Sequence, residues 1–205
     1  MQRIALLGIT GRAGSRIASE LLARGHRVTG IARNTSDTQA QAGLTLQSAD
    51  ASRADAIAPL LQGHDVVVSA TRFDGGPTAD VLLAAVREAG VRRLLVVGGA
   101  GSLEVAPGQL LVDSPSIPDH VKPESRAGVV FLDILRREQG LDWTFLSPAG
   151  MFVAGERTGK FRLGGDQLLK DANGDSRISY EDYAVAMVDE LERPTHSCHR
   201  FTLAY

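Results

Sequence analysis

The chain has 205 residues, of which 43% are hydrophobic and 22% are charged, and its formal net charge at pH 7 is -2. This composition is typical of a globular protein and excludes a disordered or fibrous chain. The slightly acidic charge gives no electrostatic basis for binding nucleic acid.

Short apolar strands alternate with amphipathic helices along the first half of the chain. Gly25, Gly63 and Gly90 are placed to end three helices, and Ser52 with Asp55 predicts a capping box at the start of one of them. The predicted strands are 3–7, 28–32, 44–48, 65–69 and 94–97, and the predicted helices are 15–24, 52–61 and 78–88. Continuous apolar strands joined by helices predict a parallel sheet covered on both faces, which right-handed crossovers make a doubly wound Rossmann sheet.

The second half of the chain is less regular. Four prolines between residues 101 and 123 predict a loop, and a loop of that length is more often functional than idle. The glycine-rich stretch 150–177 contains Asn173-Gly174, which predicts a hairpin turn. The other predicted elements are a helix at 124–138, a strand at 143–146, a helix from the capping box of Ser179 and Asp182 to 191, and a strand at 200–204. No linker divides the chain, so we expect one α/β domain over 1–205, with a small irregular region at 150–205 on the substrate side.

Three glycines, Gly8, Gly11 and Gly14, lie between the first predicted strand and the first predicted helix. Their G-x-x-G-x-x-G spacing differs by one position from the G-x-G-x-x-G dinucleotide fingerprint. It meets the same needs, which are a tight turn, close approach of a pyrophosphate, and packing of the helix on the strand. The free amides at the helix start, Ala13 to Ser15, would face an anion. We therefore predict a dinucleotide site, with a purely structural turn as the alternative.

The end of the second strand distinguishes the two nicotinamide cofactors. An acid about 20 residues beyond the loop binds the ribose hydroxyls of NAD. This chain has Arg33 there and no acid before Asp37. Arg33, helped by Arg12, is suited to the 2′-phosphate of NADP through charge-assisted hydrogen bonds. We predict NADPH as the favoured cofactor and NAD as the alternative; a solvated surface arginine is the other interpretation of Arg33.

Further candidates lie where the predicted strands end. Asp50 follows the third strand, where it either lies near the adenine or serves as a turn acid. The fourth and fifth strands end in small residues, which leave room for ribose and nicotinamide: Ser69, Ala70, Thr71, Gly98 and Gly99.

With these residues in view, the chain resembles the atypical short-chain dehydrogenase/reductase family. Within it, the likeness is to the NAD(P)H-binding, NmrA-like group, which includes NADH-flavin reductases and biliverdin-IXβ/flavin reductase. It rests on the glycine loop and on the segments 98–102, 143–148 and 178–184. The resemblance implies that the following residues border the cofactor: Gly8, Thr10, Gly11, Arg12, Ala13, Gly14, Arg33, Asp50, Ala51, Ser69, Ala70, Thr71, Gly98, Ser147, Pro148 and Ala149.

The chain departs from the Ser plus Tyr-x-x-x-Lys arrangement of ordinary members of that superfamily. None of Tyr180, Tyr183 and Tyr205 has a lysine at the required spacing, and Gly99 takes the usual serine position. We therefore predict hydride transfer to a flavin, a quinone or a similar conjugated acceptor, with flavin as a substrate and not a bound prosthetic group. A non-catalytic, NADP-sensing NmrA-like regulator is the alternative, and a sugar-nucleotide-type epimerase or dehydratase is a lesser one.

Catalytic residues are not identified by any motif. His120 and Lys122, in the proline-rich loop, are the only ionisable pair that we place near the nicotinamide, and solvated loop residues are the more favoured interpretation. No metal site is predicted, because His196, Cys198 and His199 lack a zinc-like spacing.

Cellular location follows from simple features of the chain. The single cysteine excludes an internal disulfide and suits a reducing compartment. No apolar run approaches the ~20 residues of a membrane span, and the apolar start is too short for a signal peptide. We expect a cytoplasmic monomer or homodimer that acts on a small-molecule substrate, without nucleic-acid or membrane partners.

Overall fold

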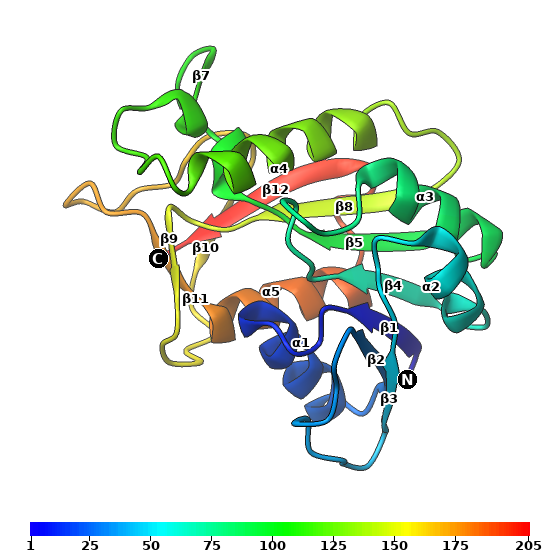
Figure 1. Cartoon of the computed structure of the whole chain (residues 1–205). Coiled ribbons are helices and arrows are strands. Elements are labelled where there is room, and N and C mark those ends of the chain that lie inside the picture. Colours follow the sequence, from blue (N-terminus) through cyan, green and yellow to red (C-terminus); the bar gives the residue numbers. More distant parts are fainter.

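The apolar strands form one eight-stranded sheet in the computed structural model, which describes residues 1–205 (Figure 1). They are β1 (Arg3–Leu7), β2 (Arg27–Ala32), β3 (Leu44–Ser48), β4 (Val66–Ser69), β5 (Arg93–Val97), β8 (Asp142–Ser147), β10 (Arg162–Gly164) and β12 (His199–Ala204). Their order is β10-β12-β8-β5-β4-β1-β2-β3, and only β10 runs antiparallel to its neighbour. The chain changes direction across the sheet between β1 and β4, so the predicted doubly wound Rossmann sheet is confirmed.

Helices cover both faces of the sheet. One face carries α1 (Arg12–Ala23) and α5 (Tyr180–Glu192), and the other carries α2 (Ala54–Leu61), α3 (Ala79–Glu88) and α4 (Lys122–Leu135). Because side chains alternate along a strand, β1 supplies Ile4 and Leu6 to the first layer and Ala5 and Leu7 to the second. The two layers bury clusters of 23 and 21 residues, which is why both faces of the strands are apolar.

Two small sheets lie outside the main one, at the side of the molecule where the carboxyl terminus lies (Figure 1). The predicted loop at 101–123 contains a hairpin of β6 (Glu104–Ala106) and β7 (Gln109–Leu110), flanked by two 3-10 turns. In the irregular region, β9 (Met151–Val153) pairs in parallel with β11 (Arg177–Ser179). Beyond β11 the chain returns to the main body as α5 and β12.

Two helices begin earlier than predicted, for local reasons. α1 begins at Arg12 and not at Ser15. Gly11, whose backbone is extended, is the N-cap, and its carbonyl oxygen accepts the N–H of Ser15 at 2.9 Å as the first hydrogen bond of the helix. α4 begins at Lys122 and ends at Leu135, so the predicted span of 124–138 is shifted. Pro123 lies in its first turn, where a missing N–H breaks no helical hydrogen bond.

One of the two predicted capping boxes is wrong. Both the N–H and the hydroxyl of Ser52 donate to the carboxylate of Asp50, at 3.0 and 2.8 Å, so Ser52 is not available to cap α2. The N-cap of α2 is Arg53, whose side chain makes no capping bond. Ser179 does cap α5, because its Oγ accepts the N–H of Asp182 at 2.9 Å.

The predicted hairpin at Asn173-Gly174 is also wrong. A turn does form, and the carboxylate of Asp171 closes it by accepting the N–H groups of Asn173 and Asp175 at 2.8 and 2.9 Å. The flanking strands, however, belong to different sheets, because β10 pairs with β12 and β11 pairs with β9.

Glu190 of α5 is a buried acid, only 3% exposed, that connects the helix to the sheet. It accepts hydrogen bonds from Arg93, Thr195 and His196 at 2.9, 2.9 and 2.8 Å. Burial raises the pKa of Glu190, but the hydrogen bonds from His196 and Thr195 outweigh burial and hold the pKa below its ordinary value.

We expect Glu190→Gln to lower the free energy of unfolding at pH 7 by about 3 kcal/mol, because Arg93 loses a buried partner. The folded-state pKa is depressed, so the contribution of the carboxylate is present above the unfolded pKa and lost as pH falls through the folded pKa. The difference from wild type should therefore shrink toward pH 3 in urea unfolding. The control Asp189→Asn, at a side chain that is 55% exposed, should cost less than about 1 kcal/mol. Equal stability of Glu190→Gln and wild type at pH 7 would contradict this expectation.

Candidate functional site

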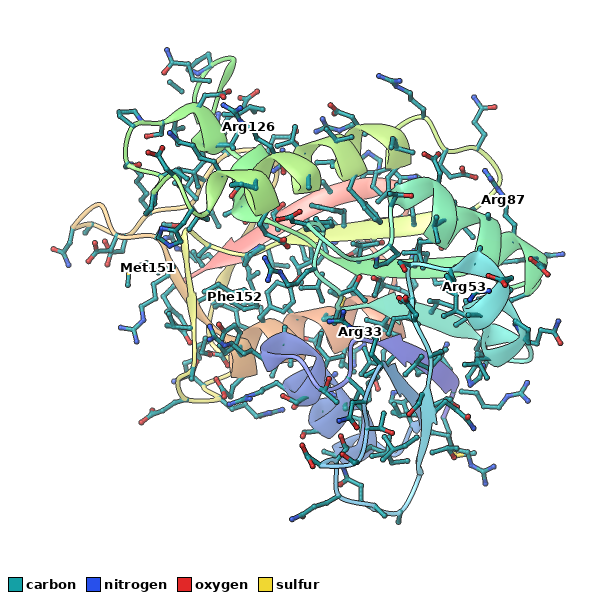
Figure 2. All side chains as sticks on the ribbon, in the orientation of Figure 1. Arg33, Arg53, Arg87, Arg126, Met151 and Phe152 are labelled. Atoms are coloured by element: carbon teal, nitrogen blue, oxygen red, sulfur yellow. The ribbon has the colours of Figure 1, made fainter.

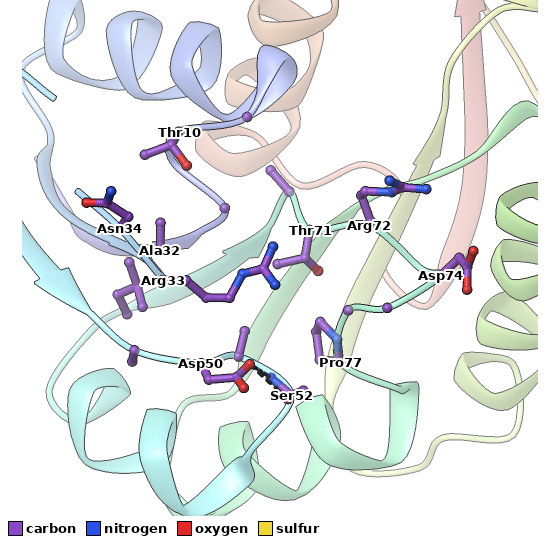
Figure 3. Close-up of a pocket in the computed structure, with 18 residues that line it drawn as sticks. Thr10, Ala32, Arg33, Asn34, Asp50, Ser52, Thr71, Arg72, Asp74 and Pro77 are labelled. Carbon is purple, nitrogen blue, oxygen red and sulfur yellow. Dashed lines mark hydrogen bonds between the residues drawn. The ribbon is translucent and has the colours of Figure 1, made fainter. Parts of the chain in front are cut away.

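A cleft of about 550 Å³ lies at the carboxyl ends of β1, β2, β3 and β4 (Figure 3). This is the switch point of the sheet, where open α/β folds bind their ligands, and the volume is that of a small-molecule site. Four segments that end or follow the strands line it, within 8–11, 31–34, 49–52 and 70–77. The cleft therefore joins parts of the chain that are distant in sequence.

The three glycines of the first loop have different roles in the cleft. Gly8 has a φ of +81°, and a Cβ on it would lie 2.5 Å from the carbonyl oxygen of Ala70. A Cβ on Gly14 would overlap the carbonyl oxygen of Gly8, so this glycine lets α1 pack on the loop. Gly11 has an ordinary φ of -73°, and its Cβ would lie 3.2 Å from the oxygen of Gly8. The backbone thus requires glycine at positions 8 and 14. At position 11, the lack of a side chain chiefly leaves the adjacent space of the cleft open.

Helix α1 points its amino end at the cleft. Its N-cap, Gly11, has no side chain to satisfy the first N–H groups. The amides of Arg12, Ala13 and Gly14 lack intrahelical acceptors, while that of Ser15 donates to Gly11. The predicted anion-facing amides therefore lie at Arg12 to Gly14 and not at Ala13 to Ser15. Free amides and the helix dipole together favour a phosphate here, so the residues present fit the pyrophosphate of a dinucleotide.

Arg33 and Asp50 contribute opposite charges to the same cleft (Figure 3). The guanidinium of Arg33 extends toward Thr71, and the carboxylate of Asp50 is bonded to Ser52. The N–H and hydroxyl of Ser52, and to a lesser extent the charge of Arg33, lower the pKa of Asp50. Asp50 therefore closes a turn and also lines the cleft, whereas its place near the adenine stays a prediction.

The cleft brings together half of the predicted cofactor residues. Those that line it are Gly8, Thr10, Gly11, Arg33, Asp50, Ala51, Ala70 and Thr71. Arg12, Ala13 and Gly14 begin α1 behind them, and the hydroxyl of Ser69 lies 3.0 Å from that of Thr71.

The other predicted cofactor residues lie beyond the cleft, at the buried ends of β5 and β8. They are Gly98, Ser147, Pro148 and Ala149. A Cβ on Gly98 would overlap the ring of Phe145, so this glycine serves packing. Contact of these four residues with a cofactor remains a prediction.

The prediction missed the far wall of the cleft, which is Arg72, Asp74, Gly75, Gly76 and Pro77. Figure 3 shows Arg72 and Asp74 at the opposite end of the cleft from Asn34. The signal for this wall is the Gly75-Gly76-Pro77 turn, which comes soon after a buried strand.

The weak catalytic candidates lie at the start of α4. His120 is exposed, and Lys122 bonds to Asp119 at 2.7 Å. Neither lines the cleft. Their predicted place near the nicotinamide is not tested by any contact in the structure.

No tyrosine hydroxyl lines the cleft. Tyr183 is fully buried and donates to the carbonyl oxygen of Leu146 at 2.6 Å, and burial raises its pKa well above the ordinary value. The ring of Tyr180 packs on that of Phe152 in β9, with 4.5 Å between the ring centroids. Figure 2 labels Phe152 and so shows where this pair lies. The hydroxyl of Tyr205 contacts Asp182 at 2.9 Å. All three tyrosines are used for packing or for hydrogen bonds within the protein.

Residues 8–194 match a protein family that is described as NAD(P)H-binding. The chain belongs to this family. The match begins at the first glycine of the loop and extends through α5, so it includes the whole cleft. The NAD(P)H-binding character predicted from the motifs is thereby confirmed, and the ligand of the family is a nicotinamide cofactor.

Three solved structures are similar to this member of the NAD(P)H-binding family over its whole length. A "putative epimerase" from Bacteroides thetaiotaomicron is 41% identical with a TM-score of 0.94, covering 100% of this chain and 97% of its own. A "putative exported protein" from Burkholderia pseudomallei is 44% identical with a TM-score of 0.90, covering 100% of both chains. A "putative NADH-flavin reductase" from Streptococcus pneumoniae TIGR4 is 36% identical with a TM-score of 0.83, covering 100% and 99%.

None of the helices combines the length and the apolar character that a membrane crossing requires.

We expect Gly11→Val to abolish dinucleotide binding and to leave the fold intact. The valine methyl groups would occupy the space that a pyrophosphate needs, while the backbone angle at Gly11 is one that any residue adopts. Isothermal titration with NADPH measures the loss, and circular dichroism checks the fold. Gly8→Val should instead unfold the protein, since its φ is positive and its Cβ meets Ala70. Micromolar binding by a folded Gly11→Val protein would mean that the dinucleotide binds elsewhere.

Proposed function

We propose that the protein is an NADPH-dependent reductase that transfers hydride to a flavin, a quinone or a similar conjugated acceptor. The observation that carries the proposal is how this member of the NAD(P)H-binding family uses its tyrosines: none lines the cleft, none begins a Tyr-x-x-x-Lys motif, and buried Tyr183 donates to Leu146. Reduction of a ketone creates an alkoxide and needs a positioned acid, normally a tyrosine. A conjugated acceptor spreads the arriving charge over its rings and takes its proton from water. The similarity to the "putative NADH-flavin reductase" of Streptococcus pneumoniae TIGR4 supports the same acceptor class.

Each part of the cleft has a role in this proposal. A bound reduced nicotinamide supplies the hydride. The amides of Arg12, Ala13 and Gly14 hold the pyrophosphate, and Asp50 and Ala51 border the adenine. At the end of β4, Ser69, Ala70 and Thr71 border the ribose. Beyond the cleft, at the ends of β5 and β8, Gly98, Ser147, Pro148 and Ala149 border the nicotinamide and the acceptor. The protein contributes mainly by holding the acceptor against the nicotinamide, since proximity alone supplies much of the rate gain.

Arg33 supports NADPH as the preferred cofactor. It lines the cleft at the end of β2, where an acid would bind the ribose of NAD. No side chain of the protein hydrogen-bonds its guanidinium, so its donors are available to a 2′-phosphate. Arg33 and Asp50 line the same cleft, and the charge of Arg33 is a lesser cause, after the hydrogen bonds of Ser52, that lowers the pKa of Asp50.

The single free cysteine supports a cytoplasmic location, which we include in the proposal with a monomer or homodimer as the working form. The similar structure from Burkholderia pseudomallei, in contrast, bears the name of a "putative exported protein". Fractionation of cells that express a tagged form of the protein distinguishes a cytoplasmic from an exported location.

We expect Arg33→Ala to weaken NADPH binding by about 1.5–3 kcal/mol, because a charge-assisted contact with the 2′-phosphate is lost. NADH binding should change by less than about 0.5 kcal/mol, since NADH carries no 2′-phosphate. The two dissociation constants are measured by titration of cofactor fluorescence. Arg53→Ala is the matched control, because Arg53 pairs with Asp55 at 2.6 Å and does not line the cleft. Equal losses for NADPH and NADH would reject the role of Arg33.

The proposed reaction predicts a particular range of substrates. Purified protein should oxidise NADPH in the presence of FMN or a quinone and show negligible activity with simple secondary alcohols. His120→Ala and Lys122→Ala should each lower kcat less than about tenfold, below the usual contribution of a general acid. A pH optimum that either substitution abolishes would show that a general acid exists.

A regulator that binds NADP without turnover is the second candidate, and the same lack of a catalytic tyrosine favours it. Tight NADP binding with no activity toward any conjugated acceptor would support the regulator and refute the reductase. The melting temperature should then rise with NADP while absorbance at 340 nm stays constant in the presence of every acceptor.

A further inference from the structure

The far wall of the cleft is held by a helix that does not itself line the cleft. This wall, residues 72–77, turns tightly after β4: Gly75 has a φ of +74°, and a Cβ on Gly76 would overlap the carbonyl oxygen of Arg72. Arg72, Asp74, Gly75, Gly76 and Pro77 all line the cleft, whereas no residue of α4 does.

Glu124, in the first turn of α4, contacts three successive residues of the 72–77 wall. Its Oε1 accepts the N–H of Phe73 at 2.8 Å, and its Oε2 accepts the N–H of Asp74 at 2.8 Å. Oε2 also lies 3.4 Å from Nε of Arg72, whose side chain is 75% exposed. The two backbone bonds are short, whereas the pair with exposed Arg72 is long and adds little.

Phe73 anchors the same wall to α4 through its ring. The ring lies 5.1 Å from that of Phe131 and 5.9 Å from that of Phe145, measured between centroids. Gly128, one turn beyond Glu124, makes room for it, because a Cβ at Gly128 would lie 3.0 Å from Cδ2 of Phe73. Helix α4 therefore holds the wall at two points, through a carboxylate and through a packed ring.

Only a carboxylate suits the first of these contacts. Two adjacent N–H groups need two acceptor atoms, and an ionised glutamate offers two. A glutamine in the same place offers one acceptor, and its NH2 group would face an N–H donor. One amide of the wall would then lose its partner, which costs more at Phe73, where the bond is part-buried, than at Asp74, where it is exposed.

We propose that Glu124 is a positioning residue for the dinucleotide: its carboxylate holds the 72–77 wall in the conformation that binds NADPH. This inference rests on the proposed use of the cleft by NADPH. Glu124 does not line the cleft and acts only through the wall, so we expect its effect on cofactor affinity and not on the hydride-transfer step. The fraction of molecules with the wall in place sets the apparent dissociation constant of the cofactor.

The test compares Glu124→Gln with wild type in direct NADP binding and in steady-state kinetics. We expect the dissociation constant and the KM for NADPH to rise about tenfold. The kcat at saturating NADPH should stay within about twofold, because bound cofactor selects the competent wall. Hydrogen exchange at the amides of Phe73 and Asp74 should become faster in the variant, and this readout needs no ligand.

Asp133→Asn is the matched control on the same helix. Asp133 is half-exposed and pairs with Arg136 at 3.3 Å, with no contact to the wall. The dissociation constant, the KM for NADPH and the exchange of the two wall amides should all match wild type in this variant.

Gly128→Ala displaces the same wall through its other anchor. The new methyl group would press on the ring of Phe73. We expect a higher dissociation constant for NADP here too. In the Glu124→Gln, Gly128→Ala double variant, the dissociation constant should rise by less than the product of the two single-variant factors. Multiplicative losses would mean that the two residues act separately, which contradicts one shared wall.

The outcomes separate this inference from the proposed function. A wild-type protein that binds no NADP(H) refutes the proposed function, and the inference falls with it. Wild-type binding with an unchanged dissociation constant in Glu124→Gln overturns the inference alone. A lower melting temperature with unchanged affinity also overturns it, because Glu124 would then serve stability only. Slower hydrogen exchange at the amides of Phe73 and Asp74 in Glu124→Gln would contradict the role of the two carboxylate oxygens of Glu124.

Discussion

The cofactor side of the molecule depends on one constraint, the close approach of bare backbone at the start of α1. Gly14 lies directly against the carbonyl of Gly8, and Gly8 lies against that of Ala70. These contacts bring the first turn of α1, the end of β1 and the end of β4 to one place. A side chain at either glycine would separate them, because the interior has no free volume to absorb the displacement. The amino end of α1, with its free amides, lies directly behind the cleft only because this approach is so close.

Contacts between distant segments position the rest of the cleft. The wall at 72–77 comes from the loop after β4, yet its amides bond to Glu124 of α4 and its phenylalanine packs beside Gly128. Helix α4 follows directly on the proline-rich segment 101–123, so the helix that supports the cleft also continues that segment.

The chemistry available to the protein follows from how its tyrosines are used. The hydroxyl of Tyr183 is fully buried and bonds to the carbonyl of Leu146, at the end of β8. It therefore helps to fix α5 on the sheet and is not free to donate a proton to a substrate. The ring of Tyr180 packs on Phe152, and the hydroxyl of Tyr205 donates to Ser179. A cleft without a positioned phenol suits an acceptor whose own rings stabilise the added charge.

The sequence by itself determined the alternation of strands and helices, the doubly wound sheet and the glycine loop, because these depend on local periodicity and on backbone freedom. It also indicated the family and the position of Arg33 at the end of β2. Only the tertiary structure decided which glycine could accept a side chain, since that depends on how near Ala70 comes to Gly8. It also decided that Ser52 bonds to Asp50 instead of capping α2, and that the strands around Asn173-Gly174 join different sheets. The contact of Glu124 with the wall joins residues about fifty positions apart, and no local pattern encodes a hydrogen bond between such distant segments.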